Sequence, residues 1–94
     1  SDLLGITGPD YKVGDDSVMV SLPGFSKKDI NLEVEGSILT ISAQEKEDGF
    51  TKAFTKQFRF PNTTDMDSLS AAMKDGILTL SFTSSDNKKT ISIK

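Results

Sequence analysis

Apolar and polar residues alternate with a period of two along most of the chain. Alternation of this kind places one set of side chains against a core and the other in water, so it predicts half-buried β-strands. The apolar members of the alternating runs are Val18, Val20 and Leu22; Ile30, Leu32 and Val34; Leu39 and Ile41; Phe54, Phe58 and Phe60; Leu78, Leu80 and Phe82; and Ile91 and Ile93. Lys56 is the one polar residue on the apolar side of its run.

Residues with turn-forming chemistry separate these runs. They stand at Gly14–Asp16, Pro23–Gly24, Glu35–Ser37, Asp48–Gly49, Pro61–Asn62 and Lys74–Gly76. Asp75-Gly76 gives the strongest hairpin signal, because both central residues of a type I′ turn need a positive φ. Short strands about eight to twelve residues apart, joined by such turns, predict an all-β antiparallel sandwich or barrel.

Two segments have the features of a helix N-terminus. Ser26–Asp29 and Asp65–Ser68 each begin with a residue type that caps helices, and Asp29 stands three positions after Ser26. Both segments are too short for a free-standing helix, so each predicts a single helical turn. Thr83–Lys89 is polar throughout and predicts a linker to the last apolar pair.

The composition describes one small globular domain. The chain has 94 residues, 35% hydrophobic and 27% charged, and a chain of this size holds one modest core. Lys plus Arg number 11 against 14 Asp plus Glu, and Arg59 is the only arginine. That balance disfavours a nucleic-acid partner, because proteins bind nucleic acids through clustered Lys and Arg side chains. No apolar run approaches the roughly 18 residues of a membrane span, so we expect a cytoplasmic protein without a membrane partner.

No residue pattern indicates catalysis. The chain has no cysteine and no histidine, which removes thiolate sites, thiol nucleophiles and the commonest general base. Acidic residues cluster at Glu45, Glu47 and Asp48 and again at Asp65 and Asp67; such carboxylates can serve glycoside hydrolysis or calcium binding, but a solvated loop is the favoured interpretation. A Ser–Lys pair stays open without a local motif, and the isolated glycines form no phosphate loop. We expect no enzyme, cofactor or metal site.

The end of the sequence has a pattern of its own. Ile91 and Ile93 are two positions apart, so in an extended chain both side chains lie on one side, about 6.6–6.8 Å apart. One interpretation is an ordinary last strand of the same sandwich. The other is a docking peptide, which adds to an exposed strand edge and places alternate side chains in two pockets.

Four stretches, in order and at suitable spacing, resemble the small heat-shock protein family (Hsp20), specifically its α-crystallin domain. They are Leu22-Pro23-Gly24-Phe25; Ser26–Gly36; Phe58-Arg59-Phe60-Pro61; and Ala71–Leu78, which is similar to the signature Ala-x-x-x-Asn-Gly-Val-Leu. Ile91-Ser92-Ile93, which follows a pair of lysines, resembles the family's C-terminal Ile-x-Ile motif. The resemblance runs from about Tyr11 to Ile93.

The resemblance implies an immunoglobulin-like antiparallel β-sandwich of about seven to nine strands. It divides the chain into a short N-terminal arm (1–10), an α-crystallin domain (11–82) and a C-terminal extension with the Ile-x-Ile motif (83–94). It also implies a stress-response chaperone that holds partly unfolded proteins without ATP or any cofactor, built from homodimers that assemble into larger homo-oligomers. The rival interpretation is an adaptor sandwich of the p23 co-chaperone type, which binds a folded partner and lacks the Ile-x-Ile tail.

The resemblance also implies binding residues. Ile91 and Ile93 are expected to dock into a groove between two strands, walled by Ile30, Leu32, Val34, Leu69, Ala71 and Met73. The dimer interface is expected at Phe50, Thr55, Gln57 and Arg59. The planar guanidinium of Arg59 suits an interface carboxylate; the alternative for this residue is an ordinary surface charge.

Two features depart from the family pattern. Bacterial and plant members have a long loop whose strand is exchanged between subunits, whereas only about ten residues separate Ser42 from Phe54 here. The spacing from Glu47 to Pro61 is similar to that of animal members, in which the corresponding strand pairs with its own copy. Both dimer modes therefore stay open. Family members also carry a longer apolar N-terminal arm than the roughly ten residues that precede Tyr11.

Overall fold

The structure is a computed structural model that describes residues 8–85 and 90–94. Most of the expected N-terminal arm and of the expected linker therefore lies outside the described residues. The elements follow in the order β1 (Tyr11–Val13), β2 (Ser17–Ser21), the short 3-10 turn η2 (Lys27–Asp29), β3 (Asn31–Glu35), β4 (Ile38–Ala43), β5 (Phe54–Arg59), β6 (Thr64–Lys74) and β7 (Ile77–Ser84).

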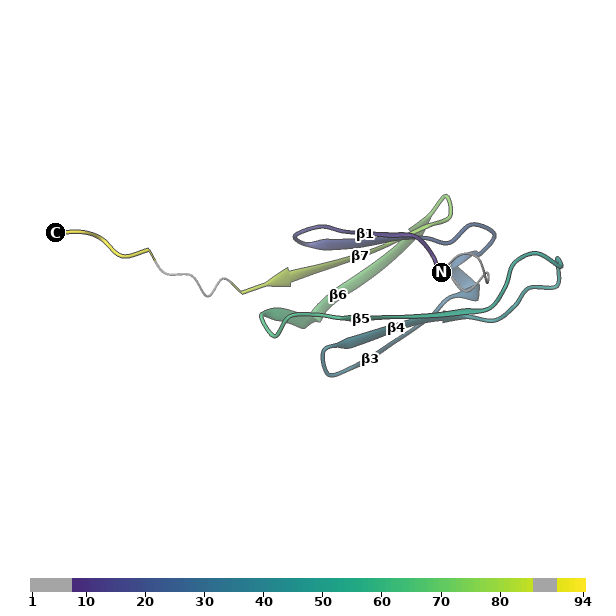
Figure 1. The fold of residues 1–94 in the computed structure, drawn as a ribbon, viewed down its shortest axis with the longest axis horizontal. Coiled ribbons are helices and arrows are strands. Elements are labelled where there is room, and N and C mark those ends of the chain that lie inside the picture. The colour runs from purple at the N-terminus through teal and green to yellow at the C-terminus, as the bar shows by residue number, and fades with distance from the viewer. Residues whose placement is uncertain (1–7, 86–89) are drawn as a thin grey trace.

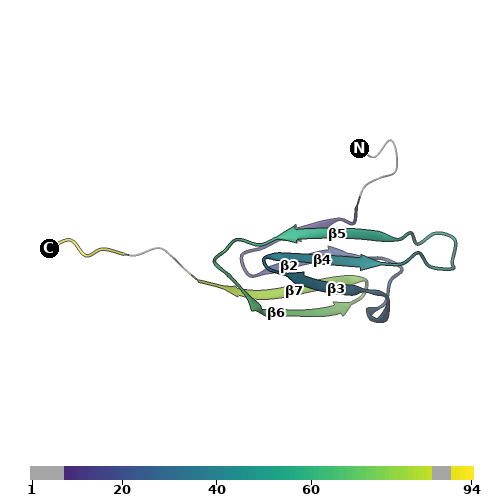
Figure 2. The ribbon, with the colours of Figure 1, turned by 90° about the horizontal axis from the view of Figure 1, so that it is seen from below.

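The strands form two sheets that lie face to face (Figures 1 and 2). One sheet has the strand order β1-β2-β7-β6 and the other has the order β3-β4-β5. Every strand pair is antiparallel. The predicted all-β antiparallel sandwich is therefore confirmed, and β1, β6, β3 and β5 are its edge strands.

The core lies between the central strands of the two sheets. Val20 and Ile41 are fully buried, and they stand on β2 and β4, each with a neighbouring strand on both sides. The buried apolar side chains are Val18, Val20, Leu22, Leu39, Ile41, Ala43, Phe60, Leu78 and Leu80. Among the described residues no polar or charged side chain is buried, so burial of apolar surface, worth about 25 cal/mol per Å², holds the sheets together.

The hairpin predicted at Asp75-Gly76 is confirmed. Lys74 and Ile77 are the last cross-strand partners of β6 and β7. The two residues between them have φ values of 51° and 78°, as a type I′ turn requires. Asp is one of the few residues other than glycine that tolerate this region of backbone conformation.

One predicted helical turn is confirmed and the other is wrong. Ser26–Asp29 forms the cap and body of η2, whereas Asp65–Ser68 belongs to β6, where the pairing with β7 shifts between Asp65 and Ser70. The Asp65 carboxylate accepts a hydrogen bond from the Asp67 amide at 3.0 Å, and the Ser68 hydroxyl donates to the Asp65 carbonyl at 2.6 Å. These local hydrogen bonds, which a helix N-terminus also uses, here support an irregularity within a strand.

Candidate protein-binding surfaces

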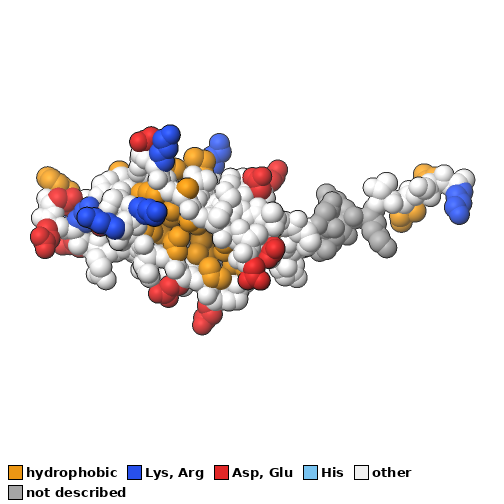
Figure 3. Space-filling view, turned by 180° about the vertical axis from the view of Figure 1, so that it is seen from behind, with side chains coloured by type: hydrophobic (Ala, Val, Ile, Leu, Met, Phe, Trp, Pro, Cys, Tyr) orange, Lys and Arg blue, Asp and Glu red, His pale blue; other side chains and the backbone are white. Residues whose placement is uncertain are grey.

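An apolar groove opens between β3 and β6, the edge strands on one side of the sandwich. It has a volume of about 430 Å³ and is lined by Lys27, Ile30, Leu32, Ala71, Ala72, Met73 and Leu78; we call it the edge groove. Figure 3 shows hydrophobic side chains gathered in the middle of one long face, surrounded by polar and charged ones. The groove therefore offers apolar surface to a partner instead of burying it in the core.

The alternation of β3 predicted a core face, and this expectation is wrong for two of its residues. Every residue of β3 is exposed; Leu32 keeps 36% and Val34 49% of its surface in contact with water. The reason is that β3 is an edge strand and that two of the residues lining the groove beside Leu32 on the β6 side are the small Ala71 and Ala72.

Four of the six residues expected to wall a groove do line it together: Ile30, Leu32, Ala71 and Met73. Val34 and Leu69 do not line it. Leu69 is partly buried against the core instead. Sequence reasoning missed Lys27, Ala72 and Leu78. From its place in the sequence, Lys27 is typical of a solvated turn, Ala72 of an outward strand position and Leu78 of a core position, so none of the three signals a groove.

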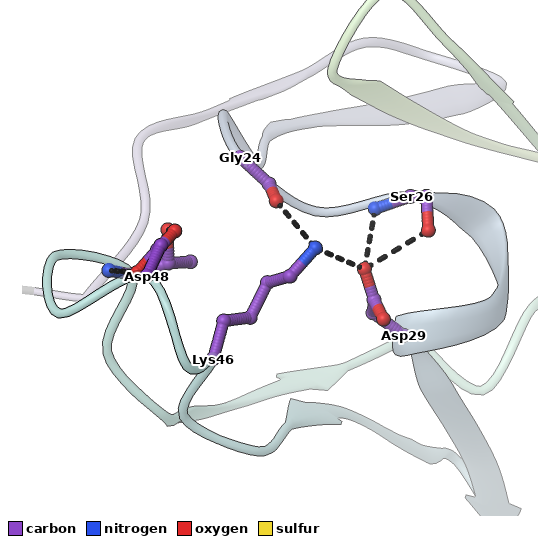
Figure 4. Close-up of polar contacts among 6 residues, drawn as sticks. Gly24, Ser26, Asp29, Lys46 and Asp48 are labelled. Carbon is purple, nitrogen blue, oxygen red and sulfur yellow. Dashed lines mark hydrogen bonds and ion pairs between the residues drawn. The ribbon is translucent and has the colours of Figure 1, made fainter.

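A lysine ties the loop between β4 and β5 to the rest of the sandwich (Figure 4). The Lys46 ammonium donates to the Gly24 carbonyl and to the Asp29 carboxylate, each at 3.0 Å. Asp29 also accepts hydrogen bonds from the Ser26 amide and hydroxyl. The amide hydrogen bond, followed by the one from Lys46, lowers the pKa of Asp29 to about 2. Turn η2 and the loop are thus fixed to one another.

Asp48, one member of the acidic cluster of this loop, has a structural role. The Asp48 carboxylate accepts hydrogen bonds from the Phe50 and Thr51 amides at 2.8 Å and from the Thr51 hydroxyl. The hydroxyl hydrogen bond is the largest of the contacts that lower the pKa of Asp48 to about 2. The Lys46 amide donates to the Thr51 carbonyl at 2.9 Å and closes the loop. Phe50, beside this closure, keeps 84% of its surface exposed.

The residues expected at a dimer interface lie along the open edge of β5 and in the loop before it. Thr55, Gln57 and Arg59 are exposed, and the other β5 residues are half-buried. The Gln57 side chain donates to the Thr40 hydroxyl at 3.1 Å, which holds it against the sheet. The structure brings Thr55, Gln57 and Arg59 into one row on β5, whereas Phe50 stands in the loop before β5 and lines a hollow together with Pro23 and Phe25.

Lys56, the residue that interrupts the alternation, has a defined place. Its ammonium lies over the Tyr11 ring at 4.7 Å and 5.4 Å from the Phe58 ring centre. The two rings meet edge to face at 5.1 Å. The lysine therefore stays on the inner side of β5, because the faces of the aromatic rings stabilise its charge. This contact also joins β1 to β5 at the second pair of sheet edges.

The two isoleucines of the C-terminal segment lie outside the sandwich strands. Residues 90–94 form no strand, and Ile91 and Ile93 are 84% and 98% exposed. They are therefore not part of an ordinary last strand, which was one of the two interpretations of this segment.

The described residues contain no group of three or more acidic side chains close enough to hold a metal ion. In residues 8–85 and 90–94 no helix has the length and apolar character of a membrane span.

The chain is similar to small heat-shock proteins in sequence. It matches the Hsp20/alpha crystallin family over residues 12–94. It is 36% identical over 76 residues to the 22.7 kDa class IV heat shock protein of Pisum sativum, an alignment that covers 67% of this chain and 39% of that protein. It is also 36% identical over 81 residues to the 16.9 kDa class I heat shock protein 3 of Oryza sativa subsp. japonica, covering 72% of this chain and 54% of the relative. The chain thus spans about half or less of the length of these relatives.

Solved structures of similar fold belong to the same group. A small heat-shock protein from Xylella fastidiosa superposes with a TM-score of 0.71 at 20% identity, over 93% of both chains; at this identity the likeness concerns the fold. Heat shock protein 16.0 from Schizosaccharomyces pombe gives a TM-score of 0.64 at 28% identity, over 93% of this chain and 74% of the other. Because the family match covers nearly the whole sequence and the sandwich agrees with it, the chain belongs to the Hsp20/alpha crystallin family of small heat-shock proteins.

Proposed function

We propose that the protein is a cytoplasmic, ATP-independent chaperone that holds partly unfolded proteins and prevents their aggregation. The observation that carries the proposal is the edge groove, an apolar surface open to water on an otherwise polar face. Unfolded chains expose apolar side chains, and each Å² that they bury is worth about 25 cal/mol. A protein that binds the unfolded state competes with aggregation by mass action, so it needs no nucleotide.

The test follows light scattering of a heat-labile protein with an equimolar amount of the full natural chain. We expect scattering to fall to the same extent with and without ATP. Leu32→Ser, in the groove, should suppress scattering less than the parent chain. The matched control is Met19→Ser, because Met19 is 43% exposed but lies on β2 in the other sheet. Absence of any suppression by the full natural chain contradicts the proposal.

The C-terminal segment supports assembly in the proposed function. Ile91 and Ile93 dock into the edge groove of another copy, where Ile30, Leu32, Ala71 and Met73 are the expected wall residues that line it. Burial of one isoleucine is worth about 1.5–3 kcal/mol, and ordering of the segment consumes much of that. One segment thus binds weakly, and several segments in one assembly bind firmly.

The C-terminal segment is long enough to enter the groove of another copy. β7 ends at Ser84, which pairs with Thr64 at the start of β6, and Ala71 pairs with Leu80. Four residues of β7 separate Leu80 from Ser84, about 13 Å. Seven residues separate Ser84 from Ile91, and a fully extended chain of that length reaches about 23–25 Å. The segment can therefore reach its own groove or that of a neighbour, and the resemblance to the family favours the neighbour.

The proposed dimer pairs the β5 edges of two copies in antiparallel fashion. β5 has a strand neighbour on one side only. The loop before it closes on its own chain through the Lys46–Thr51 backbone hydrogen bond and the Lys46–Gly24 contact. A loop closed in this way favours edge pairing over the exchange of a strand between subunits.

Charge favours one register for this dimer. A two-fold axis at Gln57 places Thr55 opposite Arg59 and Lys56 opposite Phe58, so no like charges face one another. A shift of the axis to Lys56 places two lysines opposite each other, which is destabilising. A shift to Phe58 places Pro61, which has no amide hydrogen, opposite Thr55 within the ladder.

A further inference from the structure

The edge groove has two ends that differ in charge. It lies at the start of β3, where Ile30 and Leu32 line it, and at the end of β6, where Ala71–Met73 line it. Figure 2 shows that β3 and β6 run in opposite directions. The start of β3 and the end of β6 therefore meet at one end of the groove, and the end of β3 and the start of β6 lie toward the other.

Lysines stand at the first of these ends, which we call the lysine end. Lys27 lines the groove, and Lys28 in η2 and Lys74 at the end of β6 are exposed. Asp29 is already paired with the lysine of the β4–β5 loop at 3.0 Å, and Asp75 in the hairpin turn offsets one lysine. The lysine end therefore carries net positive charge.

Carboxylates stand at the other end, which we call the acidic end. Glu33 and Glu35 are exposed on β3, and Asp65 and Asp67 are exposed near the start of β6. The Asn31 side chain donates to Glu33 at 3.0 Å, a neutral contact that leaves the negative charge in place. Figure 3 shows acidic side chains between the apolar patch and the C-terminal segment. A peptide in the groove thus has positive charge near one of its ends and negative charge near the other.

The C-terminal segment has an uneven charge distribution of its own. Lys88 and Lys89 precede Ile91 by three and two positions, and Lys94 directly follows Ile93. The two isoleucines are identical and lie on one side of an extended chain, so apolar contacts alone fit the segment in either direction. The lysines on either side of the pair distinguish the two directions.

We propose that the edge groove takes the C-terminal segment of a second copy in one direction, with Lys88 and Lys89 at the acidic end and Lys94 at the lysine end. This inference rests on the tail docking proposed above. In this direction two lysines meet four carboxylates. The opposite direction places the same two lysines against the three lysines of the other end, where like charges repel. The segment therefore runs antiparallel to β3.

The spacing along β3 agrees with this direction. Ile30 and Leu32 are two positions apart, as the two isoleucines of the tail are, and the Ile30 backbone is extended, with φ −98° and ψ 130°. When the tail isoleucines lie opposite this pair in an antiparallel alignment, Lys88 comes opposite Glu35 and Lys89 opposite Val34. Neighbouring extended chains lie about 4.8 Å apart, which is within the Debye length of about 8 Å at physiological salt.

Reversal of the tail charge tests the direction by the sign of its effect. The full natural chain with Lys88→Glu and Lys89→Glu should dissociate at a higher concentration, by up to about fivefold for each exposed ion pair lost. Light scattering coupled to gel filtration across a dilution series measures this midpoint. The opposite direction gives tighter assembly, because the new carboxylates then meet the lysine end. A tighter or unchanged assembly overturns the proposal.

A further pair of substitutions separates direction from net charge. The tail variant lowers the net charge by four, and adding Glu33→Lys with Glu35→Lys restores the value of −3 and the attraction at the acidic end, so assembly should recover. The matched control adds Asp15→Lys with Asp16→Lys, in the turn between β1 and β2, and should not recover. Equal recovery in both overturns the proposal, because net charge alone then governs assembly.

Failure of the direction is distinguishable from failure of the docking. If glycine at both Ile91 and Ile93 shrinks the assembly but reversal of the tail charge does not weaken it, the docking stands and the direction is wrong. If neither change alters the assembly, the docking is wrong and the direction falls with it.

Discussion

Leu32 and Ile41 are direct cross-strand partners on one face of the β3–β4 ladder, but Ile41 is fully buried and Leu32 is 36% exposed. The difference comes from their strands, because β4 is central and β3 lies at the edge. The same apolar face therefore fills the core at its centre and forms a binding wall at its margin.

This difference predicts unequal effects of one substitution. Ile41→Ala should lower the free energy of unfolding by about 2–5 kcal/mol, because it leaves a cavity in a packed core. Leu32→Ala should cost less than about 1.5 kcal/mol, because the side chain loses only part of a full burial. Urea unfolding of the two variants measures both values, and equal losses would show that Leu32 belongs to the core.

Acid should weaken the sandwich through two carboxylates. Asp29 and Asp48 have pKa values near 2 in the folded chain, against 3.8 as the ordinary value. The unfolded state thus binds more protons between these limits, so the stability that both groups provide is complete above about pH 4 and is lost as the pH falls toward 2. We expect Tm to fall over this range.

The control for this prediction compares two double variants. Asp29→Asn with Asp48→Asn should flatten the change of Tm between pH 5 and pH 2. Asp15→Asn with Asp16→Asn alters net charge by the same amount but touches neither set of hydrogen bonds. If Tm falls with the same slope against pH in both double variants, the acid effect does not come from Asp29 and Asp48.

Lys46→Met should loosen the loop between β4 and β5. Methionine keeps the length of the side chain but cannot donate to Gly24 or Asp29. We expect faster hydrogen exchange at the Phe50 and Thr51 amides and a Tm lower by a few degrees. Lys52→Met is the matched control, because its contact with Glu45 is longer, at 3.6 Å, and solvent-exposed.

Replacement of both tail isoleucines by glycine should shrink the assembly without weakening the domain. Ile91 and Ile93 are almost fully exposed within one chain, so their loss removes only contacts between copies. Light scattering coupled to gel filtration measures the mass, and a thermal melt measures the domain. The matched control is Thr90→Gly with Ser92→Gly, which adds similar backbone freedom but keeps both isoleucines and should leave the mass of the assembly unchanged. A much lower Tm after isoleucine replacement would mean that these residues stabilise the sandwich.

Arg59→Ala should weaken the proposed dimer, because the register about Gln57 places the Arg59 side chain against Thr55 of the other copy. An exposed surface charge is worth at most about 1 kcal/mol, or about fivefold in a dissociation constant. We expect a larger increase, measured by sedimentation across a dilution series. Lys74→Ala, at the end of β6 on the other pair of sheet edges, removes an equal charge; the same change in both variants would identify Arg59 as an ordinary surface residue.

The strands could be predicted from the sequence, but the roles of their faces could not. The alternation of Leu32 and Val34 is the same as that of Leu39 and Ile41. Only the order of strands in the sheet, which depends on distant pairings, decides that one pair is exposed and the other buried. The Asp75-Gly76 hairpin was predictable because its backbone geometry is a local property of two residues.

The contacts of the loop had no sequence signal. Lys46 meets Gly24 and Asp29 across 22 and 17 positions of the chain, and its neighbours read only as a charged, solvated segment. Asp65–Ser68 gave a misleading signal, because local hydrogen bonds of Asp and Ser are the same in a helix cap and in an irregular strand.

The exposed isoleucines of the C-terminal segment and the edge groove are two different patches of one chain, and this has a consequence for symmetry. A contact in which the C-terminal segment of one copy enters the groove of the next joins two different patches and is heterologous, whereas β5 pairing is isologous and ends at two copies. Heterologous contacts continue until a ring or shell closes. The length of the segment between Ser84 and Ile91 would then set the angle between successive dimers, and through that angle the number of copies in a closed particle.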